Sequence, residues 1–401
     1  MKKSARTFSI GAQGNSMWPL LQNGDMIEYV QTPFRDIQLN DIILIFINNV
    51  FVTHRVIYKT KTICIIRGDN NATADSIVQK ERILAKVVRF KRKGKWYGIQ
   101  DVYLTQSALY LHEIQKFETV LQLHNISHVF LKGVLISLRY ENTIPKRIYA
   151  DCDVLVKRSD SKKIEKIFNM LGYKLQERAF PQPMRLRPRL EEGPEVSFVK
   201  SVSGIPVVFD VHFVPVFLMT QLGGMNVLYP SKLLTQLGEL IIKRGERKKI
   251  KGFNYSLCSV SDQILYLTLH IFHHNFTDSI RYQLLDAVIR RGFYDWKKLA
   301  QTIKDYRLEG YVYGAFVLLK KYFKTPIPRS FLLTICPSRF ALYVTHFKIR
   351  HVDIFSQDNR TKAGIERFIL IFLLSPESFW KKTLLFLHPD IIRSIVKILR
   401  K

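Results

Sequence analysis

The sequence predicts an α+β protein in which a small all-β domain is followed by an α/β domain and then by a helical C-terminal part. Short runs rich in Ile and Val, separated by Asn, Gly and Asp, fill the first part of the chain and predict strands. Apolar residues then recur at helical spacing over 103–123, and strands and helices alternate beyond that. We therefore expect three domains, 1–98, 99–225 and 226–401.

The composition indicates a basic globular chain. Its 401 residues carry a formal net charge of +29, and 47% of them are hydrophobic, which is enough to form hydrophobic cores. So large a charge favours an anionic partner: nucleic acid, an acidic peptide or an anionic membrane surface. A lysine-rich genome would produce the same bias. The four cysteines have no C-x-x-C spacing, which argues against a disulfide framework or a zinc site.

The sequence shows no pattern typical of export or of membrane insertion. The first nine residues are too short and too polar for a secretory signal. The apolar runs 42–47 and 368–374 are shorter than the ~18 residues that a membrane span needs. We therefore expect a soluble, cytoplasmic protein.

The individual elements follow from periodicity and turn residues. In the first domain we expect strands at 25–30, 42–46, 51–58, 63–67 and 83–90, arranged as a small β-barrel-like unit. The second domain should hold helices at 103–123, 134–140 and 161–171, and strands at 128–131, 149–156, 195–200 and 206–211. The segments 178–192 and 243–251 are expected as loops. Later helices include one capped by Ser261, one at 281–290, and two amphipathic ones at 365–374 and 379–399.

Three residues of the first domain form a candidate catalytic set. Ser16 lies in a turn between a Gly and a Pro, His54 follows in a strand, and Asp75 comes later, with Asp69 close by. A serine hydroxyl is a weak nucleophile that needs a base of near-neutral pKa, which histidine supplies, and a carboxylate can orient that base. The alternative is that Ser16 caps a turn and His54 is an ordinary strand residue.

The surroundings of these residues resemble the type I signal peptidase family and the related self-cleaving repressors. The matching stretches are Gly14-Asn15-Ser16-Met17-Trp18-Pro19, Gly24-Asp25, Asn40-Asp41-Ile42-Ile43, Thr53-His54-Arg55-Val56 and Gly68-Asp69-Asn70-Asn71. The histidine at position 54 is typical of the archaeal and endoplasmic-reticulum branch. The resemblance implies Ser16 as nucleophile, His54 as base, and Asp75, with Asp69 beside it, as the acid. Many members have Ser-Gly before the nucleophile, where this chain has Gly14-Asn15.

A second candidate set consists of aspartates. Asp151 and Asp153 stand two residues apart in an expected strand, so both carboxylates point to one face of the sheet. Two neighbouring carboxylates repel each other unless a cation lies between them, and oxygen ligands suit Mg²⁺. Asp210, in another expected strand, would complete the site. The alternative is a polar strand end beside a loop.

The same region resembles an uncharacterised nucleotidyltransferase family of the DNA polymerase β superfamily. Three stretches carry the resemblance: Phe130-Leu131-Lys132-Gly133, the strand around Asp151-Cys152-Asp153, and Val208-Phe209-Asp210-Val211-His212. It implies that Asp151, Asp153 and Asp210 hold Mg²⁺, and that Lys132 and Gly133 contact a nucleoside triphosphate. The superfamily usually has Gly-Ser where this chain has Gly133-Val134.

A histidine cluster gives a third, weaker pattern. His270, His273 and His274 share one face of an expected helix, and histidines at that spacing can bind a metal. No Glu or Cys partner sits at helical spacing, so ordinary packing is the favoured explanation for these histidines.

Taken together, the sequence predicts a serine endopeptidase domain fused to a Mg²⁺-dependent nucleotidyltransferase-like domain, a combination that implies peptide maturation. The expected partners are a peptide or protein substrate and a nucleotide. Two alternatives remain: a nucleotidyltransferase whose first domain only binds peptide, and a self-cleaving regulator.

Overall fold

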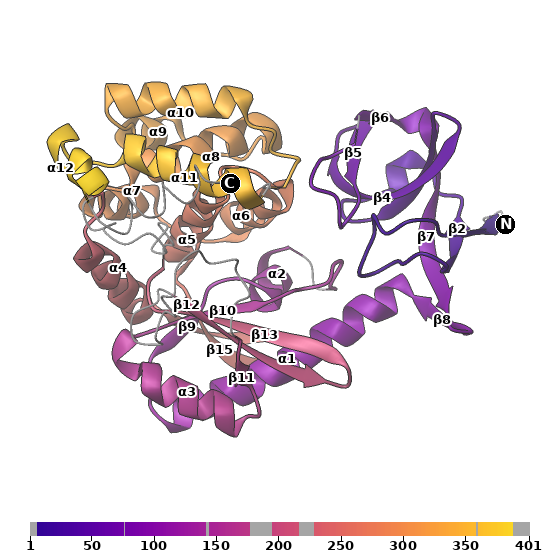
Figure 1. The fold of residues 1–401 in the computed structure, drawn as a ribbon, viewed down its shortest axis with the longest axis horizontal. Helices are drawn as coiled ribbons and strands as arrows, with labels where there is room; N and C mark the ends of the chain where they lie inside the picture. Colours follow the sequence, from indigo (N-terminus) through magenta and orange to yellow (C-terminus); the bar gives the residue numbers. More distant parts are fainter. Residues whose placement is uncertain are drawn as a thin grey trace.

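The computed structural model describes residues 6–75, 77–141, 144–176, 195–215, 228–357 and 360–387. Within these ranges the chain forms two β-sheets and a set of helices, which Figure 1 shows from the N-terminal sheet (indigo) to the last helices (yellow). The prediction of an α+β protein is confirmed. The segment 178–192, expected as a loop, lies outside the described residues, as does 388–399 of the last expected helix.

The N-terminal sheet has the strand order β1-β2-β7-β3-β4-β5-β6, with β8 added beside β7, and each of its described pairs is antiparallel. Its strands are β1 (Thr7–Gly11), β2 (Met26–Val30), β3 (Ile42–Ile47), β4 (Val50–Lys59), β5 (Ile63–Arg67), β6 (Ile77–Gln79), β7 (Ile83–Arg92) and β8 (Lys95–Gly98). Short 3₁₀ turns lie at Phe34–Asp36 and Lys80–Arg82. Each of the five strands expected here is present.

Both faces of this sheet carry buried apolar residues. Along β3, Ile42 and Leu44 belong to one core cluster, whereas Ile43 and Ile45 belong to another on the opposite face. Because successive strand residues point to opposite faces, a strand that is buried on both sides needs apolar packing partners on each face of the sheet. The described pairing leaves β1 and β6 as edges and does not close a complete barrel.

A long helix connects the first sheet to the second. Helix α1 (Ile99–Leu123) begins directly after β8, and Figure 1 shows it extending from the N-terminal sheet to the face of the second sheet. Its Phe117 ring stacks on Phe168 at 4.4 Å and meets Phe209 at 5.1 Å. All three rings are fully buried, and burial of each such side chain contributes roughly 1.5–3 kcal/mol.

The second sheet has the order β11-β12-β13-β10-β9-β15-β14 and mixes parallel with antiparallel neighbours. Its strands are β9 (His128–Phe130), β10 (Cys152–Val156), β11 (Lys174–Leu175), β12 (Glu195–Val202), β13 (Ile205–His212), β14 (Glu246–Ile250) and β15 (Phe253–Leu257). The helices between them are α2 (Val134–Tyr140), α3 (Ser161–Met170) and α4 (Ser231–Lys243), with a 3₁₀ turn at Arg158–Asp160.

The start of the expected helical part differs from the prediction. The basic segment 243–251, expected as a loop, instead ends α4 and forms β14, and the hairpin β14–β15 joins the second sheet because Leu257 pairs with Phe130 of β9. Ile250 is buried while neighbouring lysines point outward. Lysines on an edge strand are a common protection against unwanted strand pairing, which accounts for the loop-like composition.

Helices make up the rest of the described chain and pack above the second sheet in Figure 1. They are α5 (Val260–His273), α6 (Ser279–Arg291), α7 (Trp296–Asp305), α8 (Glu309–Phe323), α9 (Arg329–Thr334), α10 (Arg339–His351), α11 (Arg360–Leu374) and α12 (Phe379–Thr383), followed by a 3₁₀ turn at Leu384–Leu387. The cap of α5 was predicted two residues late: Ser259, and not Ser261, accepts the backbone N–H of Asp262.

Candidate functional site

Strand register brings the three predicted aspartates together. Strands β10 and β13 run parallel, with Asp153 directly opposite Asp210, and Asp151 immediately precedes β10. One carboxylate oxygen from each residue lies within 4.8 Å of the other two, and among the described residues this group alone has the spacing of a metal site. Asp153 is buried, whereas Asp151 and Asp210 are partly exposed. The cluster is therefore accessible from one side.

Lys132 places a positive charge directly beside these carboxylates. Its Nζ lies 3.1 Å from Asp151 Oδ2 and 3.0 Å from Asp153 Oδ2. Burial alone would lower the pKa of Lys132, but Asp151, Asp153 and Asp210 raise it above its ordinary value. The ammonium group thus stays charged and offsets part of the negative charge of the cluster.

The pKa of Asp210 reflects the negative charge that remains in the cluster. Burial, together with the charges of Asp153 and Asp151, raises the pKa of Asp210 to about 6, even though Ser197 Oγ donates a hydrogen bond to it at 2.5 Å. Three carboxylates beside one lysine provide the hard oxygen donors that Mg²⁺ prefers. The donor set thus fits a divalent cation held by Asp151, Asp153 and Asp210.

His212 fixes the orientation of the most buried aspartate. Its Nε2 lies 2.8 Å from Asp153 Oδ1, and its Nδ1 lies 3.4 Å from Glu195 Oε2. Burial lowers the pKa of His212, but the bond to Asp153 and the charge of Glu195 raise it overall. A ligand carboxylate oriented by a hydrogen-bonded neighbour is common in metal sites. The sequence indicated His212 through its motif but gave no sign of Glu195 or of Ser197.

The turn that carries Lys132 depends on glycine. Gly133 has φ of +96°, and a Cβ at this position would lie 3.1 Å from the backbone oxygen of Asp151. Leu131 N–H donates to Asp153 O at 2.9 Å, and Gln263 Nε2 donates to Leu131 O at 2.5 Å. The turn is thus held between β10 and α5, which places Lys132 beside the aspartates.

The predicted histidine cluster lies on and just after α5. The rings of His270 and His274 are 4.7 Å apart, but the three histidines do not form a metal group within the described part of the chain. Burial and the positive charges of Lys132 and Arg281 lower the pKa of His270 well below its usual value. His270 is therefore a neutral residue in electropositive surroundings.

In the N-terminal sheet, a hydrogen-bonded chain joins Ser16, His54 and Asp75. His54 Nε2 lies 2.9 Å from Ser16 Oγ, and His54 Nδ1 contacts Asp75 Oδ2. The loop after β5 packs on the serine turn, because Asn70 N–H donates to Ser16 O at 2.8 Å. A Cβ on Gly68 would meet that same oxygen at 2.6 Å, so only glycine fits there.

Asp69 has a different position from the one expected. Its two carboxylate oxygens accept hydrogen bonds from Arg55 Nε and Nη2, both at 2.6 Å, and Arg55 also donates to Tyr103 and to the backbone oxygen of Asn40. This bidentate pair holds the loop after β5 against the strand and α1. Asp75 is therefore the carboxylate that contacts His54, and Asp69 is part of the supporting ion pair.

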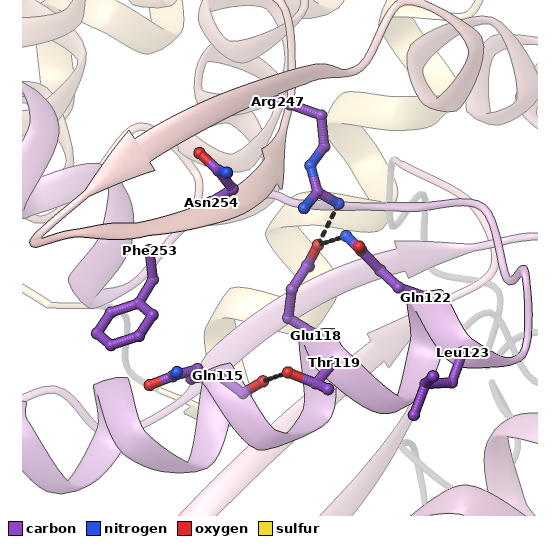
Figure 2. Close-up of a pocket in the computed structure, with 8 residues that line it drawn as sticks. All are labelled: Gln115, Glu118, Thr119, Gln122, Leu123, Arg247, Phe253 and Asn254. Atoms are coloured by element: carbon purple, nitrogen blue, oxygen red, sulfur yellow. Dashed lines mark hydrogen bonds and ion pairs between the residues drawn. The ribbon is translucent and has the colours of Figure 1, made fainter.

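One cavity lies apart from both residue sets. It has a volume of about 430 Å³ and lies between α1 and the hairpin β14–β15, as Figure 2 shows. Inside it, Glu118 accepts hydrogen bonds from Arg247 at 2.9 Å and from Ser256 at 3.2 Å, and His128 Nε2 lies 2.6 Å away. With its carboxylate so well paired, Glu118 ties the hairpin to α1. None of the predicted site residues lines this cavity.

Comparison with known families identifies the larger part of the chain. A family model described as an uncharacterised nucleotidyltransferase matches residues 86–324, which is more than half of the chain. The chain therefore belongs to this family. The match extends from β7 to the end of α8 and includes Lys132, Asp151, Asp153 and Asp210. A search of curated proteins finds no match.

The helices were also compared with the requirements of a membrane span. Among the described residues, none of the helices combines the length and the apolar character that crossing a bilayer requires.

Proposed function

We propose that this protein is a Mg²⁺-dependent nucleotidyltransferase whose metal ligands are Asp151, Asp153 and Asp210. The supporting observation is the convergence of three carboxylate oxygens within 4.8 Å, beside Lys132, inside the part of the chain that matches the family. A nucleoside triphosphate is the expected donor. An acceptor oxygen would attack its α-phosphorus, and pyrophosphate would leave.

The residues of the site have separate roles in this reaction. A bound Mg²⁺ would supply neutralisation of phosphate charge. Lys132 would place a second positive charge against the phosphates, and Gly133 would let the backbone approach them. His212 would hold Asp153 in position through its 2.8 Å contact. Such positioning and electrostatic stabilisation account for most of the catalysis in phosphoryl-type transfer.

The test is thermal melting of the full chain with and without Mg²⁺ and ATP, combined with measurement of pyrophosphate release. Wild-type protein should be stabilised, because a ligand that binds the folded state raises its stability by about 2.7 kcal/mol at 100 times Kd. The double variant Asp151→Asn/Asp153→Asn should show neither the shift nor the release. Asp305→Asn, an exposed aspartate on α7, is the matched control. An equal shift in the double variant would exclude this metal site.

We propose a second activity, serine-type peptide cleavage, on the basis of the contacts from Ser16 to His54 to Asp75. His54 would take the proton of the Ser16 hydroxyl as that oxygen attacks a peptide carbonyl, and would return it to the leaving amine. Asp75 would hold the histidine ring in the required tautomer. The substrate would be a peptide or protein, and the process peptide maturation.

A fluorophosphonate probe tests this second activity directly. Wild type should be labelled at Ser16, whereas Ser16→Ala should lose labelling and at least roughly 10⁴-fold of any peptidase rate. Ser9→Ala, an exposed serine on β1, should be labelled like wild type. An unlabelled wild type that still binds peptide would indicate a peptide-binding domain. An autocleaved band on a gel would indicate a self-cleaving regulator.

We further propose that the protein acts in the cytoplasm, because its nucleotide donor is found there. The net charge of +29 supports an anionic partner or acceptor, such as nucleic acid or an acidic peptide.

A further inference from the structure

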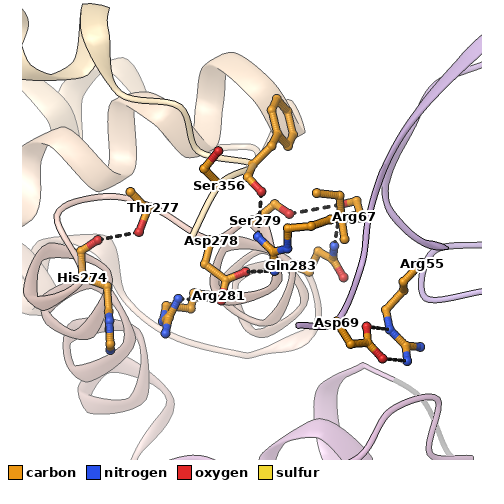
Figure 3. Close-up of polar contacts among 12 residues, drawn as sticks. Arg55, Arg67, Asp69, His274, Thr277, Asp278, Ser279, Arg281, Gln283 and Ser356 are labelled. Atoms are coloured by element: carbon orange, nitrogen blue, oxygen red, sulfur yellow. Dashed lines mark hydrogen bonds and ion pairs between the residues drawn. The ribbon is translucent and has the colours of Figure 1, made fainter. Parts of the chain in front are cut away.

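Asp278 lies where the N-terminal sheet meets the helices, and it binds two arginines from different parts of the chain. Arg67 Nη2, at the end of β5, lies 3.1 Å from Asp278 Oδ1. Arg281 Nη1, in the first turn of α6, lies 2.6 Å from Asp278 Oδ2. Figure 3 shows the carboxylate of Asp278 between the two guanidinium groups. One carboxylate therefore couples the N-terminal sheet to α6.

The Arg67 end of this chain of contacts is rigidly held. The Arg67 side chain is only 3% exposed, and its Nη1 donates to Phe355 O at 2.6 Å. Asp278 N–H donates to the neighbouring Ser356 O at 2.9 Å. A buried arginine with two fixed acceptors has little freedom, so it restricts the position of Asp278 and, through it, of Arg281.

Arg281, at the other end, acts electrostatically on the aspartate cluster and on the histidines of α5. The charge of Arg281 is among the influences that lower the pKa of Asp151, after burial, which raises it, and Lys132, which lowers it. Burial lowers the pKa values of His270 and His274, and the charge of Arg281 lowers them further. Its Nε is buried and has no hydrogen-bond partner among the described residues. A buried guanidinium N–H without an acceptor is costly, which indicates a site for a ligand oxygen.

A second unpaired donor lies on α5. Tyr266 is 3% exposed, and its hydroxyl is buried without a partner in the described part of the chain. Burial and then the charges of Asp153 and Asp151 raise the pKa of this hydroxyl, and the Tyr266 ring centroid lies 5.9 Å from that of His270 on the same helix. Helix α5 is fixed there by the bond from Gln263, one turn earlier, to the oxygen of Leu131.

We propose that Arg281 and Tyr266 bind the phosphate oxygens of the triphosphate, and that Arg67 of the N-terminal sheet positions Arg281 through Asp278. This proposal rests on the nucleotidyltransferase function and extends it, because the nucleotide site is then incomplete without the N-terminal sheet. Phosphate fits both donors: arginine and tyrosine donate to its oxygens, and the guanidinium plane suits bidentate contact. Arg67 does not touch the ligand and is a positioning residue.

The experiment measures binding of inorganic tripolyphosphate with Mg²⁺ to the full chain by titration calorimetry, so that the identity of the base does not matter. Arg281→Gln should bind roughly 10- to 100-fold more weakly, because hydrogen bonds to charged groups are worth about 1.5–3 kcal/mol each and 1.4 kcal/mol is a factor of ten. Tyr266→Phe and Arg67→Gln should each bind several-fold more weakly. Arg290→Gln, an exposed arginine of the same helix, is the matched control and should bind like wild type.

A double variant tests whether Arg67 acts through Arg281. If it does, Arg67→Gln/Arg281→Gln should bind no more weakly than Arg281→Gln alone, and additive losses would overturn the positioning role. Binding of Mg²⁺ alone should not be weakened in Arg67→Gln or Arg281→Gln, whereas a general loss of structure would weaken it. Arg67→Lys keeps the charge and the apolar stem; if Arg67→Gln does not fold, this variant should show the same weakened tripolyphosphate binding with unchanged Mg²⁺ binding.

The outcomes separate this proposal from the function on which it rests. If wild type binds tripolyphosphate, Asp153→Asn does not, and Arg281→Gln binds like the Arg290→Gln control, the function stands and this proposal is wrong. If wild type itself does not bind with Mg²⁺, both are wrong.

Discussion

Two aspartates in one loop of this protein take different partners because neighbouring strand residues face opposite ways. His54 and Arg55 are consecutive in β4, so their side chains point to opposite faces of the sheet. Asp75 meets His54 on one face, and Asp69 meets Arg55 on the other. The sequence places both acids after β5 and does not distinguish them, whereas the alternation along β4 assigns each acid to one partner.

The side chain of Glu113 shows how one buried charge makes stability depend on pH. This residue of α1 is 2% exposed and accepts hydrogen bonds from Lys116, Lys200 and Tyr173, each at 2.9 Å. Burial raises the pKa of Glu113, but these three donors together lower it to about 2. Since the folded-state pKa lies below the unfolded-state value of about 4.3, the stabilisation is complete above that pH and is lost as pH falls toward 2.

We expect Glu113→Gln to lower the free energy of unfolding at pH 7 by about 2 kcal/mol, because the charged acceptor is lost. The loss relative to wild type should shrink as pH falls from about 4.3 toward 2, where the wild-type carboxyl is protonated as well. Urea unfolding at a series of pH values measures both effects. Glu239→Gln, an exposed residue of α4, should follow the wild-type curve. A difference between Glu113→Gln and wild type that stays constant down to pH 3 would contradict this account.

At the scale of elements, the sequence predicted those parts of the fold that have a local signal. The spacing of Asp151 and Asp153 and the apolar runs around them predicted β10 and β13, and the motifs predicted Lys132 and Gly133 in the turn before α2. The parallel register of Asp153 with Asp210 has no local signal, because it depends on pairing between segments more than fifty residues apart. The family resemblance implied that Asp210 completes the site with Asp151 and Asp153, but it did not imply this register.

The elements and residues that the sequence did not predict are also set by contacts between segments that lie far apart in the chain. Glu195 and Ser197 lie opposite His212 and Asp210 in the antiparallel pair β12–β13, and nothing near them in the sequence indicates this. The hairpin β14–β15 was missed because its lysines are typical of a loop, while its place in the sheet is set by Leu257 pairing with Phe130. Arg281 was missed for the same reason, since its relevance depends on Asp278 and Asp151.

At the scale of the whole molecule, a β-bulge in β4 connects the N-terminal sheet to the helices. The register between β4 and β5 shifts between Val56 and Tyr58, which leaves Ile57 unpaired in that ladder. The backbone oxygen of Ile57 instead accepts hydrogen bonds from Ser279 Oγ at 3.2 Å and Gln283 Nε2 at 2.9 Å, both on α6. Bulges commonly redirect backbone groups in this way, and here the redirected carbonyl makes the interdomain contact.

The same contact allows a prediction about how the chain unfolds. Ile57, Ser279 and Gln283 are all buried, so removal of one donor leaves a buried carbonyl with one partner fewer. Gln283→Ala should therefore lower the free energy of unfolding by about 1–3 kcal/mol and shift the urea midpoint downward. Substitution of the exposed Gln301 on α7 by alanine removes a surface bond to Asp305 and should leave the midpoint within experimental error of wild type.

A second measurement tests whether the N-terminal sheet and the helices unfold as one unit. Trp18 and Trp96 report on the N-terminal sheet, and Trp296 reports on the helices. If the two parts unfold together, circular dichroism and tryptophan fluorescence should give the same midpoint for wild type. A Gln283→Ala variant whose midpoint equals that of wild type would show that the Ile57 contact does not hold the two parts together.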